Sequence, residues 1–380
     1  IRRNWNSNFQ LHGMTFPWSW SDLSFTDPVN RQQDHITSRG IQWLCSGQAT
    51  YRNRTMAHGT GILFASQWNE EWTNAVETAH AIDQSLNPIA YLNTQICLEP
   101  GHQALYADSR HTDESGTHLD YGIPYYVYLV TRENSYGQAL MQTITEMLDE
   151  TGCDGFYMDG WSWEKTKWAW HTAWDNCTLD INPKTHAVGG KYSSTILLQQ
   201  EWKQQLVKYL RSRDKVMIGN GGAHTHTIQQ LQVPSFTEGW STSKVVEQHL
   251  DSPMCLGGWD QSGNDRARIR MARRILDHGG LLVVWTWPDT PEALPHFSSL
   301  MYPITPIELY SGVILGEERI VTNRSGRFRW PDSSAAAVYV YDADAELVVR
   351  PLVAEVDVDG ERFTELRMPS DHLAILVRRR

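Results

Sequence analysis

The stretch TGCDGFYMDGWSWE, residues 151–164, is where the pattern of the chain is clearest. It holds a short apolar run, 155–158, with Asp154 before it and Asp159 after it. Because aspartate is poorly suited to the interior of a strand, the two acids mark the limits of one. The stretch therefore predicts a buried strand near 155–159 that carries Asp159 at its carboxyl end.

Helical patterns lie on both sides of this strand. Residues 137–151 and 194–210 each repeat apolar side chains at the spacing of an amphipathic helix. The run KVMIGN, 215–220, follows the second helix as another strand. Farther along, the basic helix predicted within 265–280 ends at a glycine pair, which is a typical stop signal. Helices and strands in alternation indicate a parallel sheet.

The same alternation extends over most of the chain. It gives eight predicted strands, near 9–16, 61–66, 88–95, 155–159, 216–220, 234–238, 254–259 and 281–286. Eight such units over about 300 residues predict an α/β fold, the (β/α)8 TIM barrel. A helix is expected at 66–83. The stretches 17–60 and 96–136 are expected as long loops after the first and third strands, and loops of that length usually belong to a binding site.

The texture of the sequence changes after about residue 314. Short runs such as AAAVYVYD and AELVVRP alternate with turn residues, and the helical spacing disappears. This pattern is typical of antiparallel strands. We therefore expect two domains, a catalytic barrel at 1–313 and a small antiparallel β-sandwich at 314–380.

Composition and charge exclude several classes of function. The 380 residues are 41% hydrophobic and 20% charged, as in an ordinary globular protein, and the net charge is −11. An acidic chain lacks the basic face that non-specific binding to nucleic acid or to an acidic membrane requires. The longest apolar runs fall short of the roughly 20 residues needed to cross a bilayer. The glycines of IGNGGAH do not match a phosphate-binding loop. We expect no nucleic-acid or membrane partner and no cofactor.

Cysteine usage and the start of the chain say less. The five cysteines are widely spaced without a CxxC pair, which favours buried free thiols over disulfides. The chain opens IRRNW, without a methionine or a signal-peptide pattern, so a processed or truncated product is expected. A secreted or periplasmic location is favoured over a cytoplasmic one, and the oligomeric state stays open.

Polar and aromatic side chains recur at the predicted carboxyl ends of the strands. Active sites of (β/α)8 barrels occur at these ends. Cleavage of a glycosidic bond needs one carboxylic acid to protonate the leaving oxygen and a second carboxylate to attack the anomeric carbon or to activate water. Tryptophan rings, of which the chain has 17, suit the flat faces of sugar rings. The arrangement therefore predicts a glycoside hydrolase with a carbohydrate substrate.

The motif DGFYMDGW, 154–161, resembles the fourth-strand nucleophile motif of retaining α-glycosidase barrels, the broad α-galactosidase and α-glucosidase superfamily. The resemblance implies that Asp159 is the nucleophile and Asp154 is structural, that the acid/base lies about two strands later, and that a C-terminal β-sandwich follows. The chain departs from α-galactosidases at Tyr157, where they usually carry a lysine, and at Glu238, where they usually carry an aspartate. The resemblance therefore supports the superfamily and an α-linked oligo- or polysaccharide, without galactose specificity.

These observations lead to a set of roles in a retaining double displacement. The expected catalytic residues are Asp159 as the nucleophile and Glu238 as the acid/base, with Asp260 as the alternative acid/base. The expected substrate-binding residues are His12, Trp18, Asn93, Glu99, Trp161, Asn220, His224, Trp240, Trp259 and Trp285.

Other functions stay open at this point. A carbohydrate-binding barrel without activity would have the tryptophans but no close pair of carboxylates. A metal-dependent hydrolase would use His224 and His226, because HxH pairs do bind zinc. In such barrels the pair typically closes the first strand, whereas this pair follows the fifth, so we expect no metal. A polysaccharide lyase, with a tyrosine or histidine base, is a further alternative.

Overall fold

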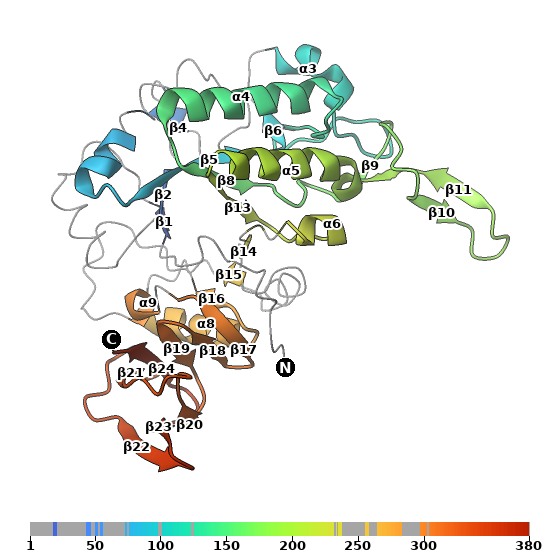
Figure 1. Cartoon of the computed structure of the whole chain (residues 1–380). Coiled ribbons are helices and arrows are strands. Elements are labelled where there is room, and N and C mark those ends of the chain that lie inside the picture. Colours follow the sequence, from blue (N-terminus) through green and yellow to red (C-terminus); the bar gives the residue numbers. More distant parts are fainter. Residues whose placement is uncertain are drawn as a thin grey trace. The chain divides into compact units, whose positions relative to one another are not determined.

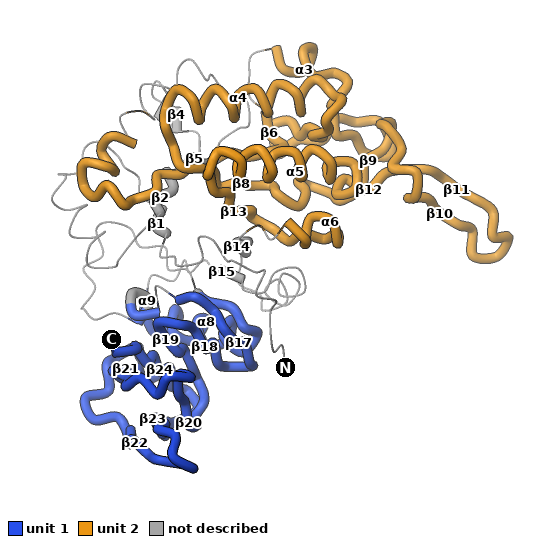
Figure 2. Tube along the Cα trace, in the orientation of Figure 1, with its two compact units in different colours: residues 1–20, 27–43, 234–380 blue, residues 21–26, 44–233 orange. Residues whose placement is uncertain are grey.

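The computed structural model of the chain describes residues 18–20, 43–46, 50–51, 54–55, 73, 76–97, 101–122, 125–231, 233, 235–237, 255–257, 264–282, 297–301 and 304–379. In the strands before residue 56 and at 235–237 and 255–257, only the backbone is described. The chain divides into two compact units, which Figure 2 colours separately. Unit 1 comprises residues 1–20, 27–43 and 234–380, and unit 2 comprises residues 21–26 and 44–233.

Unit 2 contains three adjacent parallel strands. They are β5 (Asn87–Asn93), β8 (Gly155–Asp159) and β13 (Val216–Asn220), with β8 in the middle. The register places Asn93 opposite Asp159 and Gly219 opposite Met158. The predicted strands at 155–159 and 216–220 are confirmed.

Two long helices connect these strands, α4 (Ser135–Thr151) and α5 (Thr195–Ser212). The first begins where the side chain of Asn134 accepts a hydrogen bond from the backbone of Gly137 (2.9 Å), and it ends at a left-handed Gly152. The indole of Trp202 on α5 donates to the carbonyl of Gly137 (2.8 Å), so the two helices lie side by side (Figure 1). Both predicted helices are confirmed.

Two insertions of unit 2 have structure of their own. Between β5 and α4 lie β6 (Ile96–Cys97), α3 (His102–Leu105), a 3₁₀ helix (Ala107–Ser109) and β7 (Tyr126–Val127), and β6 pairs antiparallel with β7. Between β8 and α5, β9 (Trp168–Ala169) pairs with β12 (Ser193–Ser194), while β10 (Leu179–Ile181) and β11 (Val188–Lys191) form a hairpin that extends away from the rest of the unit (Figure 1). The short helix α6 (His226–Gln229) follows β13.

The first part of the chain differs from its prediction. The structure has short strands β1 (Trp18–Trp20), β2 (Trp43–Ser46), β3 (Thr50–Tyr51) and β4 (Arg54–Thr55). The loop predicted at 17–60 is therefore wrong, because strands of two to four residues are too short to show a period in the sequence. The strands predicted at 9–16 and 61–66 lie outside the described residues. Of the helix predicted at 66–83, residues 76–82 are helical.

Unit 1 also contains parallel strands. They are β14 (Ser235–Thr237), β15 (Cys255–Gly257) and β16 (Leu281–Leu282), paired in that order. Helix α8 (Asp265–Leu276) lies between β15 and β16 in the sequence and is capped by Asn264, whose side chain accepts from the backbone of Ala267 (2.9 Å). A short helix, α9 (Phe297–Leu300), comes later. Strands and a helix occur where the sequence pattern predicts them.

The last part of unit 1 is a pair of antiparallel sheets. One contains β17 (Pro306–Tyr310), β18 (Val313–Gly316), β19 (Arg319–Thr322), β24 (Leu373–Arg378) and β21 (Ala336–Tyr341), in that order. The other contains β20 (Gly326–Phe328), β23 (Glu361–Arg367) and β22 (Leu352–Val358). Antiparallel pairing begins at Pro306, and the boundary expected at 313/314 falls inside β18.

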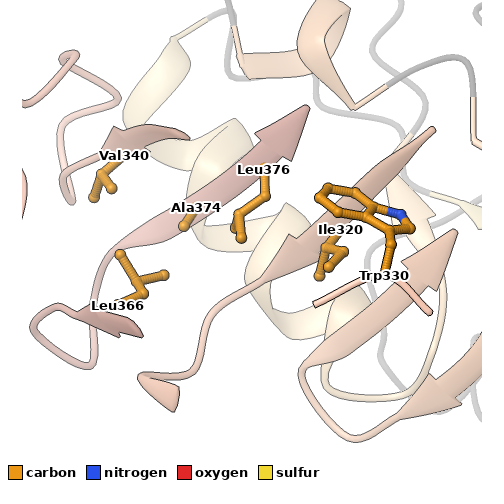
Figure 3. Packing of buried hydrophobic residues seen from close by; sticks show 6 residues of the cluster. All are labelled: Ile320, Trp330, Val340, Leu366, Ala374 and Leu376. Carbon is orange, nitrogen blue, oxygen red and sulfur yellow. The ribbon is translucent and has the colours of Figure 1, made fainter. Parts of the chain in front are cut away.

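Buried residues from both sheets pack into one core (Figure 3). The cluster comprises Ile320, Trp330, Val340, Leu366, Ala374 and Leu376. Leu366 belongs to the three-stranded sheet, and Leu376 belongs to the five-stranded sheet. The two sheets are therefore packed face to face, as in a β-sandwich.

The described cysteines differ in exposure. Cys97 and Cys153 are buried, as predicted, whereas Cys177 is exposed. The side chains of Cys45 and Cys255 lie outside the description.

Within the part of the chain that the structure describes, the helices are too short or too polar to cross a membrane.

Candidate active site

Asp159 lies at the carboxyl end of the middle strand of unit 2, between the ends of β5 and β13. Its Oδ1 accepts a hydrogen bond from the side-chain amide of Asn220 (2.7 Å) and another from the backbone N–H of Gly160 (3.0 Å). The side chain is half-buried. One donor belongs to the end of β13 and the other to the turn after β8, so Oδ1 of this carboxylate is held from two sides.

Asp154, at the opposite end of the same strand, has a different environment. Its carboxylate lies 3.1 Å from the ammonium group of Lys215 and 3.7 Å from the imidazole of His80. These contacts tie the start of β8 to neighbouring segments of unit 2. The geometry agrees with a structural role for Asp154.

The turn 159–164, which follows β8, is held by the end of the neighbouring strand. The backbone N–H of Thr94 donates to the carbonyl of Asp159 (3.1 Å), and its hydroxyl donates to the carbonyl of Gly160 (3.1 Å). The side-chain amide of Gln95 donates to the same carbonyl (2.6 Å), and its oxygen accepts from the backbone N–H of Glu164 (3.3 Å). Thr94 and Gln95 are both buried. Their bonds satisfy backbone groups of a turn that packs against the sheet end.

Glu164 is a second carboxylate in this turn, and it was not among the residues expected from the sequence. Its Oε1 accepts from the side-chain amide of Asn93 (2.9 Å), and its Oε2 accepts from the hydroxyl of Tyr121. A Cβ atom added at Gly160 would lie only 2.5 Å from Oε1 of Glu164. Glu164 and Asp159 are therefore both in contact with Gly160. In the sequence, Glu164 was distinguished only by its position at the end of the stretch 151–164, a few residues after Asp159.

Gly160 is required at this point for two reasons. Its φ of +63° is a left-handed conformation that residues with a Cβ adopt at a cost. Any Cβ would also collide with the side chain of Glu164, as the 2.5 Å separation shows. The glycine lets the side chain of Glu164 lie against the turn directly after Asp159.

Asn93 has a positioning role in the structure. Its side chain is 1% exposed. Its amide donates to Glu164, and its Oδ1 accepts from the backbone N–H groups of Gln95 (2.8 Å) and Ile96 (3.0 Å). Its polar atoms are buried and bonded within the protein, so in this structure Asn93 orients Glu164 and the segment after β5.

Tyr121 reaches the turn from the segment between β6 and β7. Its ring is 49% exposed, and its hydroxyl, besides donating to Glu164, accepts from the backbone N–H of Lys165 (3.0 Å). Partial burial, followed by the negative charge of Glu164 and the hydrogen bond to it, raises the pKa of Tyr121, and the charge of Asp159 adds to this. The tyrosine therefore stays protonated and keeps donating its hydrogen bond.

Trp161 belongs to the core rather than to a sugar platform. It is 2% exposed, and its ring lies so close to Gly219 of β13 that an added Cβ there would be 2.6 Å from Cδ1. The ammonium group of Lys203 lies 5.0 Å from the ring centroid. The ring that was expected to bind substrate is thus buried against β13 in this structure.

Lys203 lies on α5 and supports the turn from within. Its ammonium group donates to the carbonyl of Trp161 and to the carbonyl of Ser162 (3.2 Å). The hydroxyl of Ser162 in turn donates to the carbonyl of Gly222, beyond the end of β13 (3.0 Å). Burial lowers the pKa of Lys203 to about 7. Burying the ammonium group of Lys203 without a carboxylate among these contacts lowers the stability of the fold. The hydrogen bonds to the two carbonyl groups offset part of this cost.

An aromatic pair lies beyond these strand ends. The rings of Trp163 and His224 are 4.7 Å apart at an angle of 50°. Trp163 is half-buried and His224 is exposed, so both can be reached by a ligand. Nε2 of His226 instead lies 3.3 Å from the side-chain amide of Gln230 on the same short helix. Among the described residues, no group of three or more histidine, cysteine and acidic side chains is arranged to hold a metal ion.

Most of the other expected site residues lie outside the description. Trp18 is in β1, whose side chains are not described. The remaining ones, for which nothing is described, are His12, Glu99, Glu238, Trp240, Trp259, Asp260 and Trp285. Of the expected residues, the structure thus brings Asp159 and Asn220 into contact and places His224 beyond the same end of the sheet.

Comparison with known proteins gives a result for the fold. No family model matches the sequence, and no curated protein matches it either. Among solved structures, an alpha-amylase from H. orenii has a TM-score of 0.50 at 9% identity and covers 96% of this chain and 98% of its own. A GH31 alpha-xylosidase from Xanthomonas citri has a TM-score of 0.51 at 13% identity, with 96% of this chain matched to 46% of that one.

The chain has the fold of these glycosidases. The resemblance stated from the motif DGFYMDGW is therefore confirmed at the level of the fold. The likeness extends over 96% of this chain in both cases, and the chain contributes parallel strands and helices in each of its two units. This chain spans less than half of the xylosidase.

Proposed function

We propose that the protein is a glycoside hydrolase in which Asp159 is the nucleophile of a retaining double displacement. The observation that carries the proposal is the geometry of Asp159, a carboxylate at a strand end whose Oδ1 is fixed by Asn220 and by the N–H of Gly160. The fold shared with an alpha-amylase and an alpha-xylosidase supports it. We also infer that the parallel strands belong to a closed (β/α)8 barrel, with a carbohydrate substrate at their carboxyl ends.

The reaction follows from the chemistry of two carboxylates. A carboxylate oxygen of Asp159 forms a bond to the anomeric carbon while the glycosidic bond breaks, and the leaving oxygen takes a proton from the acid/base. The acid/base then removes a proton from water, which attacks the same carbon and releases Asp159. We assign the acid/base to Glu238, with Asp260 as the alternative. Two inversions at one carbon give net retention.

A rescue experiment tests this assignment. Nitrophenyl α- and β-glycosides of common neutral sugars are first screened for release of nitrophenol by the wild-type protein. On the substrate that is cleaved, Asp159→Ala should lose activity and regain part of it with azide, which replaces the missing carboxylate. The glycosyl azide formed should have the anomeric configuration opposite to that of the substrate.

The acid/base is tested with matched variants. Glu238→Ala should keep cleaving substrates whose leaving group needs no proton, and azide should give a glycosyl azide of unchanged configuration. Asp260→Asn should retain the wild-type pH profile. If Asp260→Asn lost the wild-type pH profile while Glu238→Ala behaved like wild type, the acid/base would be Asp260. Full activity of Asp159→Ala without azide would rule out the nucleophile and the mechanism with it.

A further inference from the structure

We propose that Glu164 and Tyr121 form the part of the site that recognises the hydroxyl groups of a neutral sugar ring held against Asp159. This inference rests on the proposed function, because it assumes that the sugar lies at Asp159. It adds a specificity determinant that the sequence pattern did not indicate.

The first argument is that Glu164 is held in place by three separate segments. Asn93 at the end of β5 donates to Oε1 (2.9 Å), Tyr121 from the insertion after β6 donates to Oε2, and Gln95 accepts from the backbone N–H of Glu164 (3.3 Å). Both carboxylate oxygens of Glu164 are thus held by side-chain donors. The carboxylate is fixed in direction before any ligand arrives, which lowers the entropic cost of binding.

The second argument is the location of this charge. Glu164 and Asp159 both contact Gly160, so the fold brings two acidic residues to one turn. The buried side chain of Asn93 donates to the carboxylate of Glu164, while its Oδ1 accepts from backbone N–H groups just after β5. A purely structural acceptor for Asn93 and Tyr121 would not need a negative charge.

The third argument concerns the ligand. Sugar hydroxyls are hydrogen-bond donors, and a donor to a charged acceptor makes a strong bond. Tyr121, which is exposed, donates its hydroxyl hydrogen bond to the same carboxylate. A sugar acid would bring a third negative charge to the turn that already holds Asp159 and Glu164. The chemistry therefore fits a neutral pyranoside and disfavours a uronic acid.

The test compares glycosides that differ in one hydroxyl. The probes are the nitrophenyl glycoside found in the activity screen and its monodeoxy derivatives, each with one ring hydroxyl replaced by hydrogen. Glu164→Gln keeps the shape of the side chain and removes the charge. It should lower kcat/KM roughly 10- to 100-fold on the full glycoside, the range expected for a lost hydrogen bond to a charged group. On one monodeoxy derivative, kcat/KM of Glu164→Gln should be about threefold or less below that of wild type. This probe lacks the hydroxyl that bonds to Glu164, so the wild-type protein cannot form the bond either.

Tyr121→Phe and an exposed control complete the series. Removing the hydroxyl of Tyr121 should give a smaller loss, about fivefold to tenfold, that depends on the same deoxy position. Glu201→Gln removes an exposed carboxylate on α5, 3.6 Å from Arg132, and should change nothing. Equal losses on every probe, or no loss at all, would overturn the inference and leave Glu164 as a structural residue.

Binding separates this inference from the proposed function. Calorimetric titration of Asp159→Asn with the same probes measures recognition without turnover. If the wild-type protein cleaves none of the probes, yet Asp159→Asn binds them with a dependence on one hydroxyl that Glu164→Gln abolishes, the hydrolase proposal fails and the recognition pair stands. If neither the wild-type protein nor Asp159→Asn binds a neutral sugar, the proposal that Glu164 and Tyr121 recognise one is refuted.

Discussion

The turn 159–164 and the core of the C-terminal sandwich differ in what holds them together. In the turn, polar side chains of Asn93, Gln95 and Lys203 bond to defined atoms, and a glycine leaves room for a neighbouring side chain. In the sandwich, apolar side chains such as Leu366 and Leu376 pack from two sheets (Figure 3).

The comparison shows where each part of the molecule is sensitive. Apolar burial is non-directional and contributes in proportion to area, so the sandwich should lose stability when side chains are shortened. Hydrogen bonds and charges depend on direction and distance, so the turn should lose activity when single atoms change. The predictions below test this division.

The largest effect is expected at Asp159. Asp159→Asn keeps the size of the side chain and should lower kcat at least about a thousandfold, equivalent to about 4 kcal/mol, since the nucleophile is lost. Its free energy of unfolding should stay within about 1 kcal/mol of wild type. Nitrophenyl glycoside kinetics and urea unfolding measure the two quantities. If Asp159→Asn were destabilised enough to explain its loss of activity, the expectation that this turn governs activity rather than stability would be contradicted.

The next effect is expected in the sandwich. Leu376→Ala removes a side chain that is fully buried and should lower the free energy of unfolding by about 2–5 kcal/mol. At temperatures where the variant remains folded, kcat should equal that of wild type. The matched control is Leu352→Ala on β22, an exposed leucine whose loss should cost less than about 0.5 kcal/mol. Equal costs at the two positions would refute the role of the core.

A smaller effect is expected at Gly160. Gly160→Ala strains a backbone at φ +63° and pushes on Glu164, so we expect about 1–2 kcal/mol of destabilisation and a tenfold or larger drop in kcat/KM. Gly190→Ala in the exposed strand β11, where an added Cβ meets nothing within 4 Å, is the control and should leave both unchanged. Wild-type activity of the Gly160 variant would show that the position of Glu164 against this glycine is unimportant for activity.

The last prediction is a gradual dependence of stability on pH. The pKa of Lys203 is lowered to about 7 in the folded protein from an unfolded value of 10.5, so between these values the unfolded chain binds more protons. Wild-type stability should therefore rise relative to Lys203→Met as pH increases from 7 to 9, by at most about 1.4 kcal/mol per pH unit. Chemical unfolding of both proteins across this range measures the difference. Parallel curves would mean that the buried amine does not titrate there.

The sequence predicted the elements whose patterns are long or sharply bounded. The strands at 155–159 and 216–220 are apolar runs with polar residues at their ends, and α4 and α5 have long amphipathic stripes. The first strands were not located, because runs of three or four residues carry no measurable period.

The candidate site was predicted in part for a similar reason. Asp159 could be singled out because a strand end is visible in the sequence. Glu164 could not, since its role depends on Asn93 and Tyr121, which are 71 and 43 residues away along the chain. The burial of Trp161 likewise depends on a glycine of the neighbouring strand, which no local pattern reveals.

The contact between Trp161 and Gly219 has a consequence for how relatives of this protein can vary. The indole fills the space that any side chain at 219 would occupy, so the two positions share one fixed volume. A relative with alanine or serine at 219 should carry a smaller residue at 161, and each change made alone should be harmful while the two together are tolerated. Trp161 lies two residues after Asp159, so this linked pair also restricts how the surroundings of Asp159 can evolve.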